Sequence, residues 1–321
     1  MAADIPESEL IPLRIARAES IADGISLFEL RHPQGADLPE FTPGAHVAVR
    51  VPNGLIRKYS LCNDPDERDR YCIAVKREAH EGSGSTSLVE GAKAGDMLPV
   101  SAPRNNFALA KSPAGYTFIA GGIGITPIMS MIRHLTTTGT TSFKLYYCTR
   151  GPEVTAFREE LTAAPFKSKV MIHHDEGDPA RNFDLWPILE RPKGHVYCCG
   201  PRPMMQQVRD MTGHWSPSAV HFEAFTEPAR NAPNDKPFRV RLAKSGGLVD
   251  VPVGTTILEV LRAYGLDVPS SCESGTCGTC RTGLISGEAD HRDLVLSEHE
   301  HGDNIMVCVS RARSEELVID R

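Results

Sequence analysis

The chain has 321 residues, of which 40% are hydrophobic and 24% charged, enough apolar material for two or three globular domains. It contains no run of 18 apolar residues, which excludes a membrane-spanning helix, and its net charge of −6 argues against general affinity for nucleic acid. The chain has nine cysteines, an odd number, and its N-terminal residues lack the basic region followed by an apolar run that marks a secretion signal. Both features favour a protein of the reducing cytoplasm.

The first part of the chain is predicted to be a small antiparallel β-barrel. Short alternating segments at residues 11–18, 25–31 and 46–51 are broken by Gly and Pro at the spacing of strands. Residues 1–9 before them indicate a loose acidic start.

The motif Arg57-Lys58-Tyr59-Ser60 in this barrel could hold a flavin. Tyr59 could cover the ring, Arg57 could pair with a phosphate, and Ser60 could hydrogen-bond the polar edge of the isoalloxazine. The same letters also suit an ordinary half-buried strand with a solvated arginine, so the motif alone leaves both readings open.

A strand-like segment at residues 71–77 leads into a stretch rich in glycine and serine at residues 82–87. A glycine-rich turn that opens a short helix offers free N–H groups to a phosphate, and the hydroxyl side chains of this stretch add further donors. A plain flexible loop has the same composition. Because the stretch follows a strand and Arg57, it favours a phosphate site.

From residue 116 the pattern changes to that of a nucleotide-binding unit. A short apolar strand at residues 117–120 is followed by the turn GGIGIT at residues 121–126 and a helical pattern over residues 127–135. Thr126 is predicted as the N-cap and Pro127 as the first helical residue. The positive end of such a helix would face a pyrophosphate, although the spacing differs from the G-x-G-x-x-G fingerprint.

Three further strands are predicted at residues 144–148, 170–174 and 195–199, separated by helices at residues 155–163 and 185–190. This β-α-β alternation predicts a parallel sheet. Ligands of such sheets gather at the carboxyl ends of the strands.

Three residues at these strand ends could contact a dinucleotide. Asp175 could accept hydrogen bonds from both hydroxyls of an adenosine ribose and would repel a 2′-phosphate, which favours NADH over NADPH. Arg150 is the opposing indication, because an arginine there could hold a 2′-phosphate. Cys199 ends a strand, although a buried cysteine is often only an apolar filler.

A strand at residues 220–225 closes this domain, and the polar residues 227–236, rich in Pro and Asn, have the composition of a linker. The chain is therefore expected to divide into a flavin-binding barrel (residues 1–110), an α/β nucleotide-binding domain (residues 111–226) and, after the linker, a third domain (residues 237–321).

The third domain is predicted to be a small sheet crossed by one helix. Residues 238–242 and 248–251 indicate a hairpin, and Thr256 and Glu259 form a capping box for a helix that stops at Gly265.

Four cysteines in this domain have the spacing of a plant-type [2Fe-2S] cluster. Cys272, Cys277 and Cys280 form C-x4-C-x2-C, and Cys308 follows 28 positions after the third, in a predicted strand at residues 306–309. A zinc site usually takes two paired knuckles, and the odd cysteine count argues against disulfides. The cluster is therefore the favoured interpretation.

Acidic residues dominate the segment between the third and fourth of these cysteines, with a formal balance of −4. A solvated face is the ordinary reading of any one such residue, and the functional alternative is a docking surface for a basic partner. The charged residues of the segment are Glu288, Asp290, Asp293, Glu298, Glu300 and Asp303 against Arg281 and Arg292.

With these motifs in hand, the chain resembles the ferredoxin-NADP reductase superfamily and, more narrowly, the phthalate dioxygenase reductase family, in which the plant-type ferredoxin domain comes last. The stretches SSCESGTCGTC and YCCGP carry the resemblance most specifically, and it covers nearly the whole length. It implies a flavin-binding β-barrel, a parallel α/β domain and a C-terminal β-grasp ferredoxin domain.

The resemblance also implies the cofactors and the residues that hold them. The family binds FMN, takes hydride from NADH and delivers single electrons to a Rieske-type oxygenase component. The residues expected at FMN are Arg57, Lys58, Tyr59, Ser60, Ala74, Val75, Lys76, Gly82, Ser83, Gly84, Ser85, Thr86, Ser87, Thr126 and Phe225. Those expected to border NADH are Gly121, Gly122, Thr149, Asp175, Cys199 and Gly200.

The expected activity is that of an NADH-dependent oxidoreductase that serves the oxygenase of an aromatic dioxygenase or demethylase system as a monomer, without nucleic acid or membrane partners. A flavin is needed because NADH gives two electrons as a hydride and the cluster accepts one. No acid-base residues are assigned. FAD in place of FMN, a redox sensor, and a haem monooxygenase as electron acceptor remain alternatives.

Overall fold

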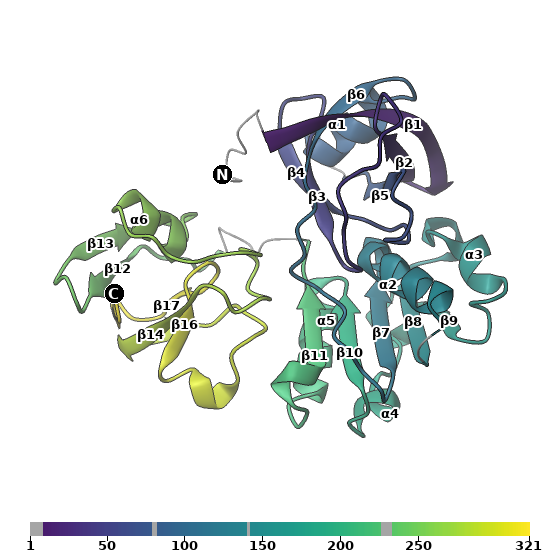
Figure 1. The fold of residues 1–321 in the computed structure, drawn as a ribbon. Coiled ribbons are helices and arrows are strands. Elements are labelled where there is room, and N and C mark those ends of the chain that lie inside the picture. The colour runs from purple at the N-terminus through teal and green to yellow at the C-terminus, as the bar shows by residue number, and fades with distance from the viewer. Residues whose placement is uncertain (1–8, 79–81, 140–141, 226–232) are drawn as a thin grey trace. The chain divides into compact units, whose positions relative to one another are not determined.

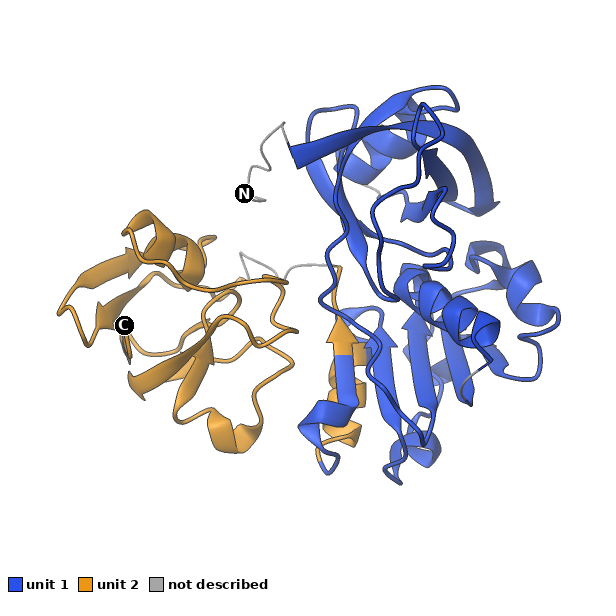
Figure 2. Ribbon diagram, viewed as in Figure 1, with its two compact units in different colours: residues 1–204, 214–221 blue, residues 205–213, 222–321 orange. Residues whose placement is uncertain are grey.

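A computed structural model describes all residues except 1–8, 79–81, 140–141 and 226–232 (Figure 1). The predicted acidic start and most of the predicted linker therefore lie outside the described residues. The chain divides into two compact units, coloured in Figure 2. Unit 1 comprises Met1–Met204 and His214–His221, and unit 2 comprises Met205–Gly213 and Phe222–Arg321.

The first half of unit 1 is the predicted antiparallel barrel. Its six strands have the order β4-β3-β6-β1-β2-β5, and an antiparallel bridge between Leu61 and Ile73 joins the two outer strands of that order. The bridge removes the open edges that a flat sheet would expose. The elements are β1 (Leu10–Ala22), β2 (Ile25–Arg31), β3 (His46–Arg50), β4 (Ile56–Ser60), β5 (Tyr71–Lys76), α1 (Gly84–Gly91) and β6 (Met97–Ser101).

The second half of unit 1 contains the predicted parallel sheet, with the strand order β11-β10-β7-β8-β9. Strands β10, β7, β8 and β9 pair in parallel. The elements are β7 (Tyr116–Gly121), α2 (Ile125–Thr137), β8 (Phe143–Thr149), α3 (Arg158–Thr162), β9 (Val170–His174), α4 (Trp186–Leu189), β10 (His195–Cys199), α5 (Arg202–Met211) and β11 (Val220–Glu223). Most of α5 and the second half of β11 belong to unit 2.

A shared core joins the barrel to the parallel sheet within unit 1. One buried cluster includes Cys72 and Ala74 of the barrel together with Phe118 and Ile128 of β7 and α2. Arg133 of α2 reinforces it, because its guanidinium binds the carboxylate of Glu160 and also donates to the main-chain carbonyl of Cys62. Unit 1 is therefore held by apolar packing and by a partly buried arginine.

Helix α2 begins earlier than predicted. Its N-cap is Gly124, and Thr126 lies inside the first turn with its hydroxyl donating to the carbonyl of Ile123 at 3.1 Å. The prediction of Thr126 as N-cap is wrong because Gly122–Gly124 already turn as a 3-10 helix, so the α-helix continues from that turn.

Unit 2 contains the predicted ferredoxin domain. Its main sheet has the order β13-β12-β18-β14-β16, in which β12 and β18 are parallel, and β15 pairs with β17. The elements are β12 (Phe238–Leu242), β13 (Leu248–Val251), α6 (Ile257–Ala263), β14 (Arg281–Ser286), β15 (Ala289–Asp290), β16 (Asn304–Met306), β17 (Arg311–Ala312) and β18 (Glu316–Ile319).

The capping box of α6 is confirmed. The Thr256 hydroxyl accepts from the main-chain N–H of Glu259 at 3.1 Å, and the Glu259 carboxylate accepts from the N–H of Thr256 at 2.9 Å. Gly265 follows the helix with φ +91°, a conformation that favours glycine. In the described part of the chain, no helix has both the length and the apolar character that crossing a membrane requires.

Candidate cofactor sites

The structure brings Arg57 of β4 onto the first turn of α1. A Cβ added to Gly84 would lie 2.6 Å from Cγ of Arg57, so only glycine leaves room for the arginine side chain at this position. A guanidinium beside the N-terminus of an eight-residue helix combines a positive charge with helical N–H groups. The arrangement could hold a phosphate.

The hydroxyl groups of the predicted phosphate loop are largely occupied within the protein. Ser83 is the N-cap of α1 and accepts from the N–H of Thr86 at 3.2 Å. Ser85 accepts from the N–H of Glu78, and Ser87 accepts from the N–H of Asn53 at 2.9 Å. Helix N–H groups and Arg57, more than serine hydroxyls, are therefore available to a phosphate.

Tyr59 and Ser60 follow Arg57 on β4. The Tyr59 hydroxyl is buried without a hydrogen-bond partner among the described residues, and burial raises the pKa of this phenol. Leaving a buried hydroxyl unpaired is costly, about 1–3 kcal/mol. A flavin beside Tyr59 fits this orphaned group. Thr126 is buried, while Ala74 and Val75 are buried on β5 and Lys76 is exposed.

The glycines of the predicted dinucleotide turn serve close packing. A Cβ on Gly124 would lie 2.1 Å from the carbonyl oxygen of Cys199, and one on Gly121 would lie 3.2 Å from Cα of Gly200. The start of α2 and the end of β7 therefore approach the end of β10 in a way that only glycine permits. Gly122 has φ +53° with open space around it, and so it is required for its conformation.

Thr149, Asp175 and Cys199 lie at the carboxyl ends of β8, β9 and β10. The Thr149 hydroxyl lies 2.9 Å from Nδ1 of His174, and the Asp175 carboxylate accepts from the N–H of Gly177 at 2.7 Å. Cys199 is 1% exposed, so its side chain is a filler of the core and only its main chain could border a ligand. Sequence reasoning did not single out His174 as a site residue.

Phe225 follows β11 in unit 2 and is 45% exposed. Its expected role beside the flavin stays a prediction.

The four predicted ligand cysteines sort into two pairs of sulfurs. The largest influence on the pKa of the Cys272 thiol comes from the Cys277 side chain, and the largest on the pKa of the Cys280 thiol comes from the Cys308 side chain; both lower the pKa. Cys308 is not in a strand as predicted. It is buried in the turn after β16, because the strand ends at Met306.

The pairing distinguishes two kinds of metal centre. Four thiolates around one tetrahedral zinc ion, each at about 2.3 Å, lie about 3.8 Å from one another. Among the described residues, no three of these sulfurs lie within 4.8 Å of one another, because the single group that meets this limit is Asp64, Asp66 and His134. Two separated sulfur pairs fit a binuclear cluster, with one pair for each iron.

The cluster loop directs main-chain N–H groups at sulfur. Ser274 and Thr276 donate to Sγ of Cys272 at 3.4 Å. The pKa of the Cys272 thiol is lowered to about 4, first by its hydrogen bond with Cys277 and then by the bonds with Thr276 and Ser274. These bonds favour the thiolate that an iron ion needs.

A glycine fixes this loop to its support. Gly275 has φ +77°, and a Cβ there would lie 3.0 Å from Cα of Asp293 and 2.8 Å from Cγ2 of Val309. The carbonyl of Gly275 accepts from the N–H of Leu294 at 2.8 Å. The loop therefore rests directly on the segment that leads toward Cys308.

The predicted acidic docking face is smaller than the sequence suggests. Asp293 is 2% exposed, and its carboxylate accepts from the N–H groups of Val295 and Leu296, so its expected place on a surface is wrong. Asp290 pairs with Arg292, and Glu300 pairs with Arg281. The remaining acidic groups of the segment are Glu288, Glu298 and Asp303.

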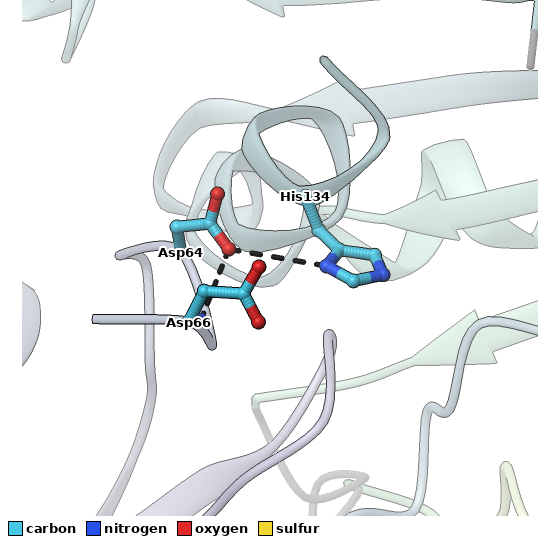
Figure 3. Close-up of side chains that lie close together, drawn as sticks. All are labelled: Asp64, Asp66 and His134. Carbon is cyan, nitrogen blue, oxygen red and sulfur yellow. Dashed lines mark hydrogen bonds and ion pairs between the residues drawn. The ribbon is translucent and has the colours of Figure 1, made fainter. Parts of the chain in front are cut away.

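Figure 3 shows the Asp64, Asp66 and His134 group, which joins the barrel to α2. Both oxygens of Asp64 are in use within the protein. One accepts from the Thr137 hydroxyl at 2.6 Å, and the other accepts from the N–H of Asp66 at 3.2 Å and lies 3.9 Å from Nδ1 of His134. These contacts give the group a structural role as a link between a loop and a helix.

Comparison with protein-family models finds one model in each part of the chain. Residues 12–109 match the oxidoreductase FAD-binding domain, residues 118–210 match the oxidoreductase NAD-binding domain, and residues 240–313 match the 2Fe-2S iron-sulfur cluster binding domain.

The chain is 56% identical over 310 residues to the phthalate 4,5-dioxygenase oxygenase reductase subunit of Pseudomonas putida, covering 96% of each chain. The chain belongs to the phthalate dioxygenase reductase family. The solved structure of phthalate dioxygenase reductase has a TM-score of 0.71 at 54% identity, covering 98% of this chain and 99% of that one. Members of this family combine a flavin domain, an NAD domain and a [2Fe-2S] domain, and the chain is accordingly an oxidoreductase that supplies electrons to an oxygenase.

Similarity also extends to part of a haem enzyme. An intact type IV self-sufficient cytochrome P450 monooxygenase matches at 33% identity with a TM-score of 0.71, covering 98% of this chain and 41% of that one. The reductase architecture is therefore also found fused to a haem enzyme.

Proposed function

We propose that the chain binds FMN in its barrel and NADH at the carboxyl ends of its parallel strands, and that it passes single electrons from its [2Fe-2S] cluster to a Rieske-type oxygenase component. The loop of three cysteines whose main-chain N–H groups donate to Sγ of Cys272, with Cys308 as the fourth thiol, carries this proposal, because it supports a one-electron centre. When bound, the flavin supplies the conversion of a two-electron donor to one-electron steps.

The preference for FMN over FAD rests on the similarity to phthalate dioxygenase reductase, since FAD carries a phosphate at the same distance from the ring. Arg57 and Tyr59 lie two residues apart on β4, about 7 Å along a strand, which suits the phosphate and the ring of either flavin. Arg57 and the N–H groups of α1 would hold the terminal phosphate of FMN, and Tyr59 and Ser60 would contact the ring.

The remaining proposed roles are those of the four cluster cysteines and of one carboxylate at the NADH site. Cys272 and Cys277 would hold one iron, and Cys280 and Cys308 the other. Asp175 would accept hydrogen bonds from the adenosine ribose of NADH.

The test is an anaerobic titration of the purified holoprotein with NADH, followed by visible absorption and by electron paramagnetic resonance, after the released flavin has been identified by mass. We expect FMN, two irons per chain, and a signal of a reduced [2Fe-2S] cluster at less than one equivalent of NADH. FAD in the extract, or zinc in place of iron, would contradict the assignment.

The acceptor is tested by mixing the reduced protein with a phthalate-type oxygenase component and, separately, with a haem monooxygenase domain. Reduction of the Rieske centre at a rate that supports turnover is expected. Faster reduction of the haem would favour the second candidate, which the similarity to the P450 monooxygenase supports.

We also propose that the chain is a monomer and docks transiently through Glu288, Glu298 and Asp303. Because complementary charge mainly speeds encounter, the rate of electron delivery should fall as salt is raised, with little change in the rate of flavin reduction by NADH. A delivery rate independent of salt would contradict the docking proposal, and a mass of twice the chain in solution would contradict the monomer.

A further inference from the structure

A buried chain of hydrogen bonds lies beneath the carboxyl ends of β8 and β9. Thr155 Oγ1 lies 2.7 Å from the carbonyl of Gly151, and Thr149 Oγ1 lies 2.8 Å from Thr155 Oγ1. Thr149 Oγ1 also lies 2.9 Å from Nδ1 of His174, its partner in the register of the two strands. Thr149 and Thr155 are both buried, so water does not replace any of these partners.

The number of available protons determines which atom donates in each of these three hydrogen bonds. Three contacts of 2.9 Å or less each need one proton between their heavy atoms, because two lone pairs at this distance repel each other. The two threonine hydroxyls bring two protons, and the Gly151 carbonyl brings none. The third proton must come from Nδ1 of His174. Nδ1 therefore donates to Thr149, Thr149 donates to Thr155, and Thr155 donates to Gly151.

The tautomer determines what His174 offers on its other side. With the proton on Nδ1, the neutral ring carries a lone pair on Nε2 and can only accept a hydrogen bond there. No partner for Nε2 is found among the described residues, and Nε2 is absent from the buried polar atoms that lack one. The acceptor nitrogen of His174 is therefore open to solvent.

His174 occupies the place where a nucleotide would arrive. It is the last residue of β9, and the carboxylate of Asp175 follows directly at the same end of the parallel sheet. The ribose hydroxyls of NADH are donors to such a site. A 2′-phosphate as in NADPH offers only acceptor oxygens when fully ionised, so a second acceptor beside Asp175 would disfavour it.

We propose that His174 is a coenzyme-specificity residue whose Nε2 accepts a hydrogen bond from an adenosine ribose hydroxyl of NADH, and that Thr149 and Thr155 hold it in the accepting tautomer. The proposal rests on NADH binding at these strand ends, as proposed above. Thr155 is a positioning residue, since it acts only through the direction of the hydrogen-bond chain.

The direct test observes the tautomer by 15N NMR of the oxidised holoprotein labelled at histidine, with the His174 signals assigned through their loss in His174→Gln. The wild type is expected to show a protonated Nδ1 and a proton-free Nε2 at His174. In Thr155→Val the Thr149 hydroxyl loses its acceptor at 2.8 Å and keeps only the Gly151 carbonyl at 3.4 Å, so its proton is free to turn to Nδ1 at 2.9 Å, which moves the ring proton to Nε2. Thr155→Ser keeps the hydroxyl and should keep the wild-type tautomer.

The second readout is steady-state kinetics with ferricyanide as acceptor. Thr155→Val should raise KM for NADH roughly three- to tenfold, the usual value of one hydrogen bond, with kcat nearly constant. Its ratio of kcat/KM for NADPH to that for NADH should rise, and Thr155→Ser should behave as the wild type. Titration of the wild type with NAD⁺ should shift the Nε2 resonance of His174, and NADP⁺ should shift it less.

Three outcomes overturn the inference. The wild type could carry its proton on Nε2, NAD⁺ could leave the Nε2 resonance unmoved, or the tautomer could change in Thr155→Val without a change in KM for either coenzyme. The first two outcomes are measured on the wild type, so the inference can still be refuted if Thr155→Val folds poorly. A wild type that fails to oxidise NADH at all would instead refute the proposed function, while the tautomer would still be read.

Discussion

His46 on β3 is a buried histidine whose neutral form the fold prefers. Burial lowers its pKa to about 4, and the positive charges of Lys58 and Arg104 act in the same direction. Its strand partner is Ser60 of the predicted flavin motif. A proton added to His46 would therefore place a charge inside the barrel wall that also carries the proposed FMN site.

The first prediction is a loss of stability in mild acid. The folded pKa of His46 lies below the value of 6.5 in an unfolded chain, so the unfolded state binds more protons between about pH 6.5 and pH 4. The contribution of this residue is present above pH 6.5 and is lost as the pH falls toward 4, by up to about 3 kcal/mol. Thermal unfolding from pH 7.5 to pH 4.5 should show a shallower decline in His46→Gln than in the wild type, and equal slopes would contradict it.

The second prediction concerns a glycine that no other residue can replace. Gly124→Ala would force a Cβ to within 2.1 Å of the carbonyl of Cys199, which is backbone and cannot move aside easily. We expect a loss of at least about 2 kcal/mol in the free energy of unfolding, measured by urea titration. Gly302→Ala is the matched control because a Cβ there meets nothing within 4 Å and φ is not positive, so its stability should change by less than about 0.5 kcal/mol.

At the scale of elements, helix α6 depends on its capping box more than on its length. It spans Ile257–Ala263, two turns, and a helix this short has little stability of its own. It stands directly before the cluster loop, and Leu258 donates its N–H to the carbonyl of Val307 beside Cys308. The start of this helix therefore supports the segment of the fourth cysteine.

The third prediction follows from that position. Thr256→Ala removes the acceptor of the Glu259 N–H and should cost about 1 kcal/mol, whereas Thr256→Ser keeps the hydroxyl and should cost much less. Bleaching of the cluster absorption in urea should begin at lower concentration in the alanine variant. Identical bleaching curves in the two variants would show that the cap does not support the cluster domain.

The sequence predicts elements well where local pattern and fold agree. β2, β9, β10, β12 and β13 have the predicted bounds, since their alternation or apolar runs end at Gly, Pro or polar residues. The errors arise where tertiary contacts decide. Helix α3 is shorter than its apolar pattern, as Phe157 before it adopts φ +58°. Cys308 lies in a turn because β16 already ends at Met306.

The candidate site residues also differ in whether the sequence alone could predict them. The spacing of residues along the sequence predicted the four cysteines and Arg57-x-Tyr59, because residues close in sequence are also close in space within one loop or strand. The buried position of Asp293 and the contact of Thr149 with His174 depend on pairing between distant segments, which the letters do not carry. Asn53, which holds Ser87 at the start of α1, was missed for the same reason.

At the scale of the whole molecule, the chain divides into two folded units. The flavin and NAD domains share a core in unit 1, whereas the iron-sulfur domain has its own apolar core, built around Val240, Leu258 and Ile305. Damage to the cluster should therefore leave the chemistry of unit 1 intact.

The fourth prediction separates the two activities. Cys280→Ser should lose reduction of cytochrome c or of the oxygenase component by at least about a hundredfold, because the one-electron outlet is gone. Reduction of ferricyanide by NADH should persist within about threefold, since that acceptor can take electrons from flavin directly. Cys148→Ser is the control, because this buried cysteine lies on β8 and is not a proposed ligand. Equal loss of both activities in Cys280→Ser would contradict independent units.

The division of the cluster cysteines between a loop and the turn after β16 also constrains biogenesis. Three thiols come from a single short segment, and the fourth comes into reach only once β14 and β16 have paired. Iron and sulfide delivered to a nascent, unpaired chain would meet an incomplete set of donors and be lost. Cluster insertion is therefore expected to be coupled to the pairing of β14 with β16, and a variant that slows this pairing should accumulate as colourless protein even with iron in excess.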